Sequence, residues 1–213
     1  MIRVVNFPFC NFYSLQRYLS TRKYKYEVLS NQLSIISAED LIILPGVGSF
    51  GDGMSYLVEN SLDVVIKNHV NSGGNVLGIC LGMQLLFSSS EESPNIKGLS
   101  LICGTVNKIK PHPSFRIPHI GWNEIVFSTG INKLPPFEVD HNGRSVADFY
   151  FVHSYVVSPA NTELVTAYFD HPHGPLPAAC ALGSVKGIQF HPEKSGTDGY
   201  LLLDNYLAET NCL

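Results

Sequence analysis

The pentapeptide GICLG, residues 78–82, places a cysteine between two glycines directly after a short apolar run. We predict that residues 76–79 form a buried strand and residues 81–88 a helix, so that only Cys80 separates them. A turn this tight requires strained backbone angles at the turning residue and neighbours without bulk. The Gly-x-Ser-x-Gly elbow of hydrolases meets the same requirement. The pattern predicts a nucleophile at the carboxyl edge of a sheet, although a buried structural cysteine explains the pentapeptide alone equally well.

The following helix adds a chemical reason to expect a nucleophile. Backbone N–H groups at a helix N-terminus favour the thiolate form of a nearby cysteine and donate hydrogen bonds to a developing oxyanion. We therefore expect the N–H of Leu81 to be one oxyanion donor. The glycine-rich segment LPGVGSFGDG, residues 44–53, brings a bare backbone that can offer a second donor near Gly48. Taken alone, that segment is equally consistent with a flexible surface loop.

A thiol nucleophile needs a base, and His191 is the strongest candidate among the eight histidines. It directly follows the apolar run at residues 187–190 and precedes Pro192 and Glu193. Proline fixes the local backbone, so an imidazole and a carboxylate two residues apart can point the same way. We predict that Glu193 orients His191 toward Cys80. Four other histidines lie in polar or Pro/Gly-rich stretches and are expected on the surface: His69, His141, His171 and His173.

The order of apolar runs predicts an α/β fold in a single domain, residues 1–213. In roughly the first 90 residues, expected strands at 2–6, 26–29, 40–44 and 76–79 are separated by expected helices at 11–20 and 54–69. Parallel neighbours require such crossovers, so we expect a central, mostly parallel sheet flanked by helices. The second half is rich in expected strands, at 101–109, 122–127, 149–157, 164–168, 179–185 and 187–190. A hairpin turn is expected at 184–187 and a final helix at 198–209.

Composition and charge exclude several classes of protein. A net charge of −4 without any cluster of Lys or Arg argues against nucleic-acid binding. Residues 68–90 lack charged side chains, but their polar residues and glycines argue against a membrane span. The N-terminus lacks the long apolar core of a secretory signal. The five cysteines include no CxxC pair, which favours neither a disulfide framework nor a zinc site. We expect a soluble, cytoplasmic protein.

Three segments between residues 44 and 195, LPGVGSFGDGM, GICLGMQLLF and GIQFHPEKS, together resemble the class I (triad) glutamine amidotransferases. Within that family, PHIGWNEI (118–125) and DFYFVHSY (148–155) are most similar to the glutaminase subunits of imidazole glycerol phosphate synthase. The resemblance implies the class I glutamine amidotransferase fold. It also implies that Cys80 attacks the side-chain amide of L-glutamine to give a thioester and ammonia. His191 would act as base and then acid, and Glu193 would orient it.

The resemblance also implies the residues that surround this chemistry. Gly48 and Leu81 would supply the oxyanion donors, and no cofactor or metal ion is expected. The positions that would hold glutamine are Gln84, Glu92, Ser154 and Tyr155. Gln84 fits independently, because one helical turn after Cys80 lies over the same site. We further expect the glycine-rich loop to leave the Gly48 N–H turned away from the site in the resting protein.

The family implies a partner as well, a (β/α)8-barrel cyclase that receives the ammonia and makes imidazole glycerol phosphate and AICAR in histidine biosynthesis. Residues expected to be exposed toward that partner are Pro118, His119, Trp122, Asn123 and Lys194; the alternative for Trp122 is a position that plugs the core. Asn11 is the only good match to the family's usual Asp-Tyr-Gly-x-Gly-Asn segment, and residues 135–142 also depart from expectation.

These departures leave an alternative, a paralogous glutaminase subunit that supplies a different acceptor, such as an enzyme amidinating a surface sugar. A third hypothesis, a catalytically silent binding subunit, is disfavoured because Cys80, His191 and Glu193 are all present.

Overall fold

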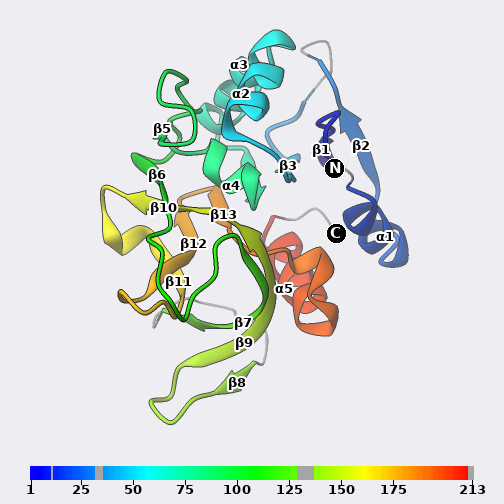
Figure 1. The fold of residues 1–213 in the computed structure, drawn as a ribbon. Helices are drawn as coiled ribbons and strands as arrows, with labels where there is room; N and C mark the ends of the chain where they lie inside the picture. The colour runs from blue at the N-terminus through cyan, green and yellow to red at the C-terminus, as the bar shows by residue number, and fades with distance from the viewer. Residues whose placement is uncertain (11, 32–35, 129–136, 211–213) are drawn as a thin grey trace.

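Five parallel strands form one half of a ten-stranded sheet in the computed structural model, which describes residues 1–10, 12–31, 36–128 and 137–210 (Figure 1). Their order in the sheet is β2-β1-β3-β4-β13. The bounds are β1 (Ile2–Val5), β2 (Tyr26–Leu29), β3 (Leu41–Leu44), β4 (Asn75–Ile79) and β13 (Val185–Ile188). The first four strands match the expected apolar runs, and β13 joins them from the far end of the sequence.

The other half of the sheet is antiparallel, and a small second sheet lies beside it. The large sheet continues from β13 through β12 (Leu176–Leu182), β11 (Val165–Phe169), β7 (His119–Phe127), β9 (Ser145–His153) and β8 (Glu138–Val139). The small sheet contains β10 (Tyr155–Pro159), β6 (Gly104–Lys108) and β5 (Ser89–Ser90). The predicted fold class, a mostly parallel sheet with a strand-rich second half, is confirmed.

Helices cover both faces of the parallel half because its strands are apolar on both sides. Ile43 packs with α1 (Tyr13–Thr21) and α5 (Gly196–Glu209), whereas its neighbour Ile42 packs with helices on the opposite face. The helices of that second face are α2 (Phe50–Glu59), α3 (Leu62–Asn71) and α4 (Leu81–Leu85). Figure 1 shows α1 and α5 on one side of the parallel strands and α2 to α4 on the other. Two short 3₁₀ helices complete the chain, η1 (Thr162–Leu164) and η2 (Pro192–Lys194).

Three sequence predictions of local structure are wrong. The single helix expected at 54–69 is two helices, because Ser61 adopts a left-handed conformation with φ of 56°. The strand expected at 149–157 is broken at Ser154, where the chain leaves β9 for β10 in the other sheet. The hairpin turn lies before the expected 184–187 and begins at Gly183, whose φ is 57°. In each case the apolar pattern runs on through a change of backbone direction.

Two histidines expected on the surface are buried. His69 and His171 are only 6% and 7% exposed. The His69 ring lies against Gly74, where an added Cβ would come within 2.2 Å of it, and its Nε2 donates to the Asn75 carbonyl at 3.2 Å. The sequence around both residues is polar, which suggested exposure. In the fold the His69 ring forms a hydrogen bond and the His171 ring packs against Phe115.

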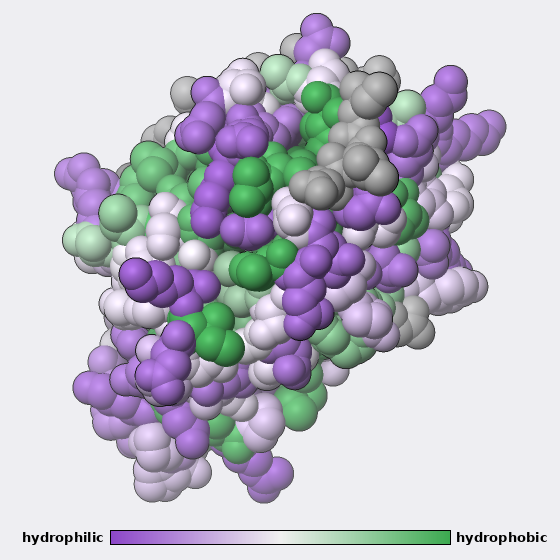
Figure 2. All heavy atoms as spheres, turned by 90° about the horizontal axis from the view of Figure 1, so that it is seen from above, coloured by the Kyte–Doolittle hydropathy of each residue, from purple (hydrophilic) through white to green (hydrophobic). Residues whose placement is uncertain are grey.

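The outer surface mixes both kinds of side chain. Viewed from above in Figure 2, hydrophobic groups are interrupted by hydrophilic ones. None of the helices within the described residues combines the length and the apolar character that crossing a bilayer requires.

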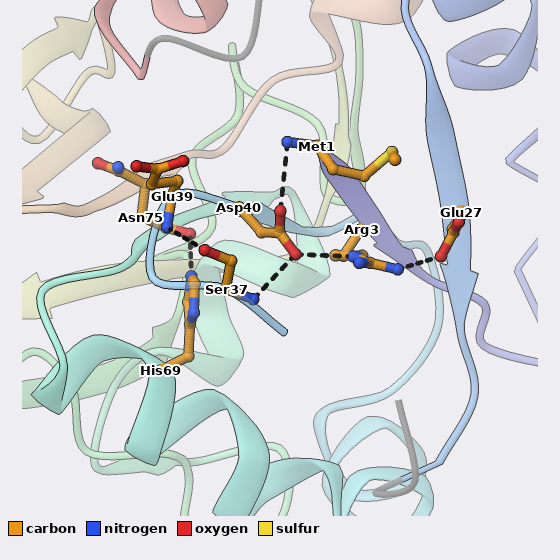
Figure 3. A network of polar contacts seen from close by, with 8 residues as sticks. All are labelled: Met1, Arg3, Glu27, Ser37, Glu39, Asp40, His69 and Asn75. Carbon is orange, nitrogen blue, oxygen red and sulfur yellow. Dashed lines mark hydrogen bonds and ion pairs between the residues drawn. The ribbon is translucent and has the colours of Figure 1, made fainter. Parts of the chain in front are cut away.

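A polar network joins three of the parallel strands near their amino ends (Figure 3). Asp40, immediately before β3, accepts from the Met1 amino group at 3.2 Å and from Arg3 Nε at 2.9 Å. The backbone N–H of Ser37 also donates to this carboxylate at 3.2 Å, and Arg3 pairs in addition with Glu27 of β2. Burial raises the pKa of Asp40, but the hydrogen bonds from Arg3 and Ser37 outweigh it and leave the pKa below its ordinary 3.8.

The network predicts a pH-dependent contribution to stability. Asp40→Asn should lower the free energy of unfolding by about 1–3 kcal/mol at pH 7, because Arg3 and the Met1 amino group lose their buried counter-charge. Since the folded-state pKa is depressed, the difference from wild type should be full above pH 4 and shrink as the pH falls below it. Urea unfolding between pH 3 and 7 measures it. Glu59→Gln, an exposed change at the end of α2, is the control; equal loss at every pH would contradict the prediction.

Candidate active site

Cys80 alone joins β4 to α4, as the sequence predicted. Its backbone angles are φ 54° and ψ −106°, a region that residues with side chains rarely occupy. Both flanking glycines are required by close backbone contacts. A Cβ added at Gly78 would lie 2.5 Å from the carbonyl oxygen of Gly82. A Cβ added at Gly82 would lie 1.7 Å from the carbonyl oxygen of Leu44. The turn therefore exists only with glycine at these two positions, and it places the buried side chain of Cys80 at the strand end, on the wall of a pocket.

The pairing of β4 with β13 brings His191 to the same edge. The two strands are parallel, and Ile79 lies opposite Ile188 in the register. The chain beyond β13 is then fixed against β9: the His191 N–H donates to the Tyr150 carbonyl at 2.8 Å. The Ser195 hydroxyl donates to the His191 carbonyl at 2.6 Å and accepts from the Tyr150 N–H at 2.9 Å. These bonds hold the turn that carries His191 in place.

Glu193 orients the His191 ring. Nδ1 of His191 lies 2.7 Å from Oε1 of Glu193, and because a carboxylate accepts, Nδ1 carries the proton. Nε2 is buried and has no hydrogen-bond partner among the described residues. Burial lowers the pKa of His191, but the negative charges of the Cys80 sulfur and Glu193 raise it well above its ordinary 6.5. The arrangement therefore favours a protonated His191 beside the Cys80 sulfur.

A pocket of about 270 Å³ opens beside Cys80. It brings together all the residues predicted to hold glutamine or an oxyanion: Gly48, Leu81, Gln84, Glu92, Ser154 and Tyr155. Pro118, predicted at the partner interface, lies on its wall as well. Sequence reasoning missed four further lining residues, Val47, Ile120, Val152 and His153. The last two directly precede the bend at Ser154, which no pattern in the sequence revealed.

The structure separates the two neighbouring acids, Glu91 and Glu92. Glu92 lines the pocket, and its Oε2 accepts from the Phe50 N–H at 2.6 Å in the first turn of α2. Glu91 instead accepts from the Lys108 N–H at 2.7 Å at an exposed position. Glu92 can therefore contact a ligand in the pocket, whereas Glu91 forms a hydrogen bond with β6 of the small sheet.

The expected oxyanion donors are not both available in this conformation. The Leu81 N–H donates to the Gly46 carbonyl at 3.2 Å, so it is engaged within the chain. Gly48 has a φ of 128°, and an added Cβ would lie 2.9 Å from the ring of Phe9. The segment that departs from the family pattern thus packs on this loop. An oxyanion can use the Leu81 N–H only after the Gly46 carbonyl has moved, whereas the direction of the Gly48 N–H stays a prediction.

The residues predicted at the partner surface have different fates. The prediction that His119 is exposed is wrong. This residue is 9% exposed, and its ring stacks on Phe151 and Phe169. Trp122 is 59% exposed and does not plug the core. Pro118 and Lys194 are exposed and Asn123 is half-buried, whereas Asn11 lies outside the described residues.

Gln189 is a site residue that the sequence analysis left without a role. It follows β13, is fully buried, and its Nε2 lies 3.6 Å from the Cys80 sulfur. The signal that could have identified it is a carboxamide within the apolar run that precedes His191.

In the part of the chain that the structure describes, no group of three or more His, Cys, Asp or Glu side chains is arranged to hold a metal ion.

Comparison with known proteins decides the family. The family model "Glutamine amidotransferase class-I" matches residues 4–209. This chain belongs to that family. The glutamine amidotransferase resemblance seen in the sequence is thereby confirmed, and the amidotransferase fold accounts for the parallel half of the sheet.

Individual relatives narrow the similarity. The imidazole glycerol phosphate synthase subunit HisH of Halalkalibacterium halodurans is 38% identical over 213 residues, which cover 98% of this amidotransferase and 95% of the relative. The protein of the same name from Thermotoga maritima is 44% identical over 170 residues, covering 79% and 75%. A solved crystal structure of a glutamine amidotransferase has a TM-score of 0.72 at 17% identity, with 99% and 98% of the two chains covered. That structure supports the fold alone.

Glu193→Gln tests the electrostatic role of the carboxylate in this amidotransferase. Removing its negative charge should lower the pKa of His191 toward 6.5 and slow glutamine hydrolysis by about 10²–10⁴-fold. Histidine NMR titration and a glutaminase assay measure the two effects. Glu163→Gln, in the exposed η1, is the control that should change neither. A His191 titration identical to wild type would refute the assigned cause of the pKa shift.

Proposed function

We propose that this protein is the glutaminase subunit of an imidazole glycerol phosphate synthase and that it supplies ammonia for histidine biosynthesis. The observation that carries the proposal is the juxtaposition of Cys80 with the His191–Glu193 pair beside a pocket. The proposal is also supported by similarity, since this chain aligns over 98% of its length with a HisH subunit. The relatives' names favour this acceptor over the alternative of a surface-sugar enzyme. The intact reactive groups disfavour a silent binding subunit.

The chemistry follows from the positions of the reactive groups. The Cys80 thiolate attacks the side-chain amide carbon of L-glutamine, and the carbonyl oxygen takes the negative charge. His191 then gives its Nε2 proton to the leaving nitrogen, so that ammonia departs and a thioester remains. In the second half His191 takes a proton from water, the hydroxide attacks the thioester, and glutamate leaves. Glu193 keeps the ring in one orientation through both halves.

The pocket supports a substrate of the size of one amino acid. We propose that Gln84, Glu92, Ser154 and Tyr155 hold glutamine there and that Gly48 and Leu81 stabilise the oxyanion. Glu92 offers a carboxylate, which suits the α-ammonium group of the substrate. Engagement of Leu81 by Gly46 implies that full activity requires a rearrangement of the glycine-rich loop.

Ammonia explains why such an enzyme should work as a subunit. At neutral pH, ammonia released into water is mostly protonated and loses its nucleophilicity, so transfer inside a complex preserves it. We propose a partner cyclase with a (β/α)8-barrel fold, docked over the mouth of the pocket. Ile120 lines the pocket, and Trp122 lies two residues further along β7; they are 60% and 59% exposed, and we propose that together with Pro118 they form an apolar surface for the partner. Asn123, Lys194 and the undescribed Asn11 are proposed neighbours, and the whole chain is proposed to act as one cytoplasmic domain.

Cys80→Ala tests the proposed nucleophile. Glutamine-dependent synthesis by the complex should fall by about 10⁴-fold or more, because no thioester can form. Synthesis from added ammonium should continue at the wild-type rate, since the acceptor enzyme is unchanged. Both rates are measured in the same assay of imidazole glycerol phosphate formation. Retained use of glutamine would contradict the assignment of Cys80, and Cys103→Ala, at an exposed position, is the control.

Trp122→Ala tests the proposed partner and its surface. Titration of the wild-type protein with the histidine-pathway cyclase should give a stable complex and faster glutamine hydrolysis when the cyclase holds its nucleotide ligand. The variant should bind roughly tenfold more weakly or worse, because exposed aromatic side chains dominate many interfaces. Val58→Ala, 57% exposed on α2, should bind normally. A wild-type protein that neither binds nor responds to the cyclase would favour a different acceptor enzyme.

A further inference from the structure

Gln189 is buried at the centre of the site and contacts the sulfur that reacts. Its side chain is 0% exposed, and Nε2 lies 3.6 Å from Sγ of Cys80. We propose that Gln189 is a further catalytic residue, which donates a hydrogen bond to the Cys80 thiolate and sets its position and charge state. The proposal rests on the proposed function, because it assigns a role within the same glutamine-hydrolysing site.

The parallel register places Gln189 beside Cys80. Gly187 lies opposite Gly78 and Ile188 opposite Ile79, so the next residues on the two strands, Gln189 and Cys80, leave the sheet together. Their backbones are also linked, since the Cys80 N–H donates to the Ile188 carbonyl at 2.7 Å. The Gln189 side chain therefore reaches the sulfur from the residue directly after a neighbouring strand, and the strand pairing sets its position.

Burial of a carboxamide is costly unless its polar atoms have partners. The partners of this side chain are Cys80 and Gln84, whose Nε2 donates to Oε1 of Gln189 at 3.1 Å. Its own backbone N–H is satisfied separately by the Ala178 carbonyl at 2.8 Å. The polar end of Gln189 thus serves groups of the active site and contributes nothing to the sheet's own hydrogen bonds.

The hydrogen-bond network fixes which end of the Gln189 amide faces the sulfur. The Tyr155 carbonyl can only accept, and it accepts from Nδ1 of His153 at 2.8 Å and from Nε2 of Gln84 at 3.2 Å. The amide nitrogen of Gln84 therefore points toward Tyr155, and it also faces Gln189. Turning the Gln189 amide around would set two N–H donors against each other. The unturned amide directs its own N–H groups at Cys80.

The charge of the sulfur explains what this donor accomplishes. A further polar contact of Sγ is the Val152 carbonyl at 3.9 Å, to which only a protonated thiol can donate. A thiolate needs hydrogen-bond donors instead. Gln189 provides a neutral donor, in addition to the charged His191. The bond strengthens when the sulfur is negative and weakens in the neutral thioester. Gln189 therefore favours the thiolate before attack and again when it departs from the second tetrahedral intermediate.

Alkylation of Cys80 tests the proposal independently of glutamine use. Gln189→Met has a similar shape but no N–H donor, so its rate of alkylation by iodoacetamide at pH 6 should be about tenfold lower than wild type. At pH 9, where thiols in model peptides are largely ionised, the two rates should converge. The rates are followed by mass spectrometry of the Cys80 peptide in the isolated full-length protein. Gln16→Met, on α1 and away from the pocket, is the matched control and should react as wild type.

Gln189→Glu separates this role from mere support of Gln84. It keeps an acceptor for Gln84, but at pH 8 it puts a carboxylate beside the sulfur, so alkylation should be at least about tenfold slower. It also decides the matter if Gln189→Met does not fold, as judged by circular dichroism. A folded Gln189→Met protein that alkylates within twofold of wild type at pH 6, or a folded Gln189→Glu protein that does so at pH 8, would overturn the proposal. That result is distinct from failure of the proposed function, which is a wild-type protein that alkylates normally but never hydrolyses glutamine with its partner.

Discussion

The parallel pairing of β4 with β13 is the contact on which the site depends. These strands lie far apart in the chain, since Gln189 follows Cys80 by 109 residues. Pairing Ile79 with Ile188 aligns their carboxyl ends, and everything reactive leaves the sheet at that edge. Glycines at 78 and 187 face each other in the same register, and an added Cβ at Gly187 would lie 2.6 Å from Met83 on α4. The small residues that let α4 approach the sheet thus also locate the nucleophile.

Electrostatics then determines the state of the groups that the sheet has gathered. An imidazole as buried as His191 would by itself remain neutral, and the negative charges of Glu193 and the Cys80 sulfur reverse that preference. The positive charge of His191 lies between these two negative groups, which offsets part of the cost of burying them. By contrast, the backbone that should receive an oxyanion is satisfied elsewhere, because Gly46 holds the Leu81 N–H. The structure thus combines a cysteine beside an oriented histidine with a Leu81 N–H that is engaged within the chain, which agrees with the proposed dependence of activity on a partner.

The sequence predicted the fold class well because its strongest signals are local and physical. Apolar runs of four or five residues mark the parallel strands, and a cysteine between glycines marks the turn at the end of β4. Errors occurred where an apolar pattern continued through a bend, as at Ser61 and Ser154. His119 was misjudged for a related reason: it alternates with the exposed Ile120 along β7, and only packing against other strands shows which face is buried.

By itself, the sequence determined the elbow at Cys80 and the short spacing that lets Glu193 hold His191, because both depend on residues within a few positions of each other. Only the tertiary structure decided which of two adjacent acids lines the pocket, that the Leu81 N–H is engaged, and that Gln189 faces the sulfur. These outcomes depend on hydrogen bonds between segments brought together by the sheet. A hydrogen-bonding side chain can be recognised as part of the site only when the distant segments that it contacts are in place.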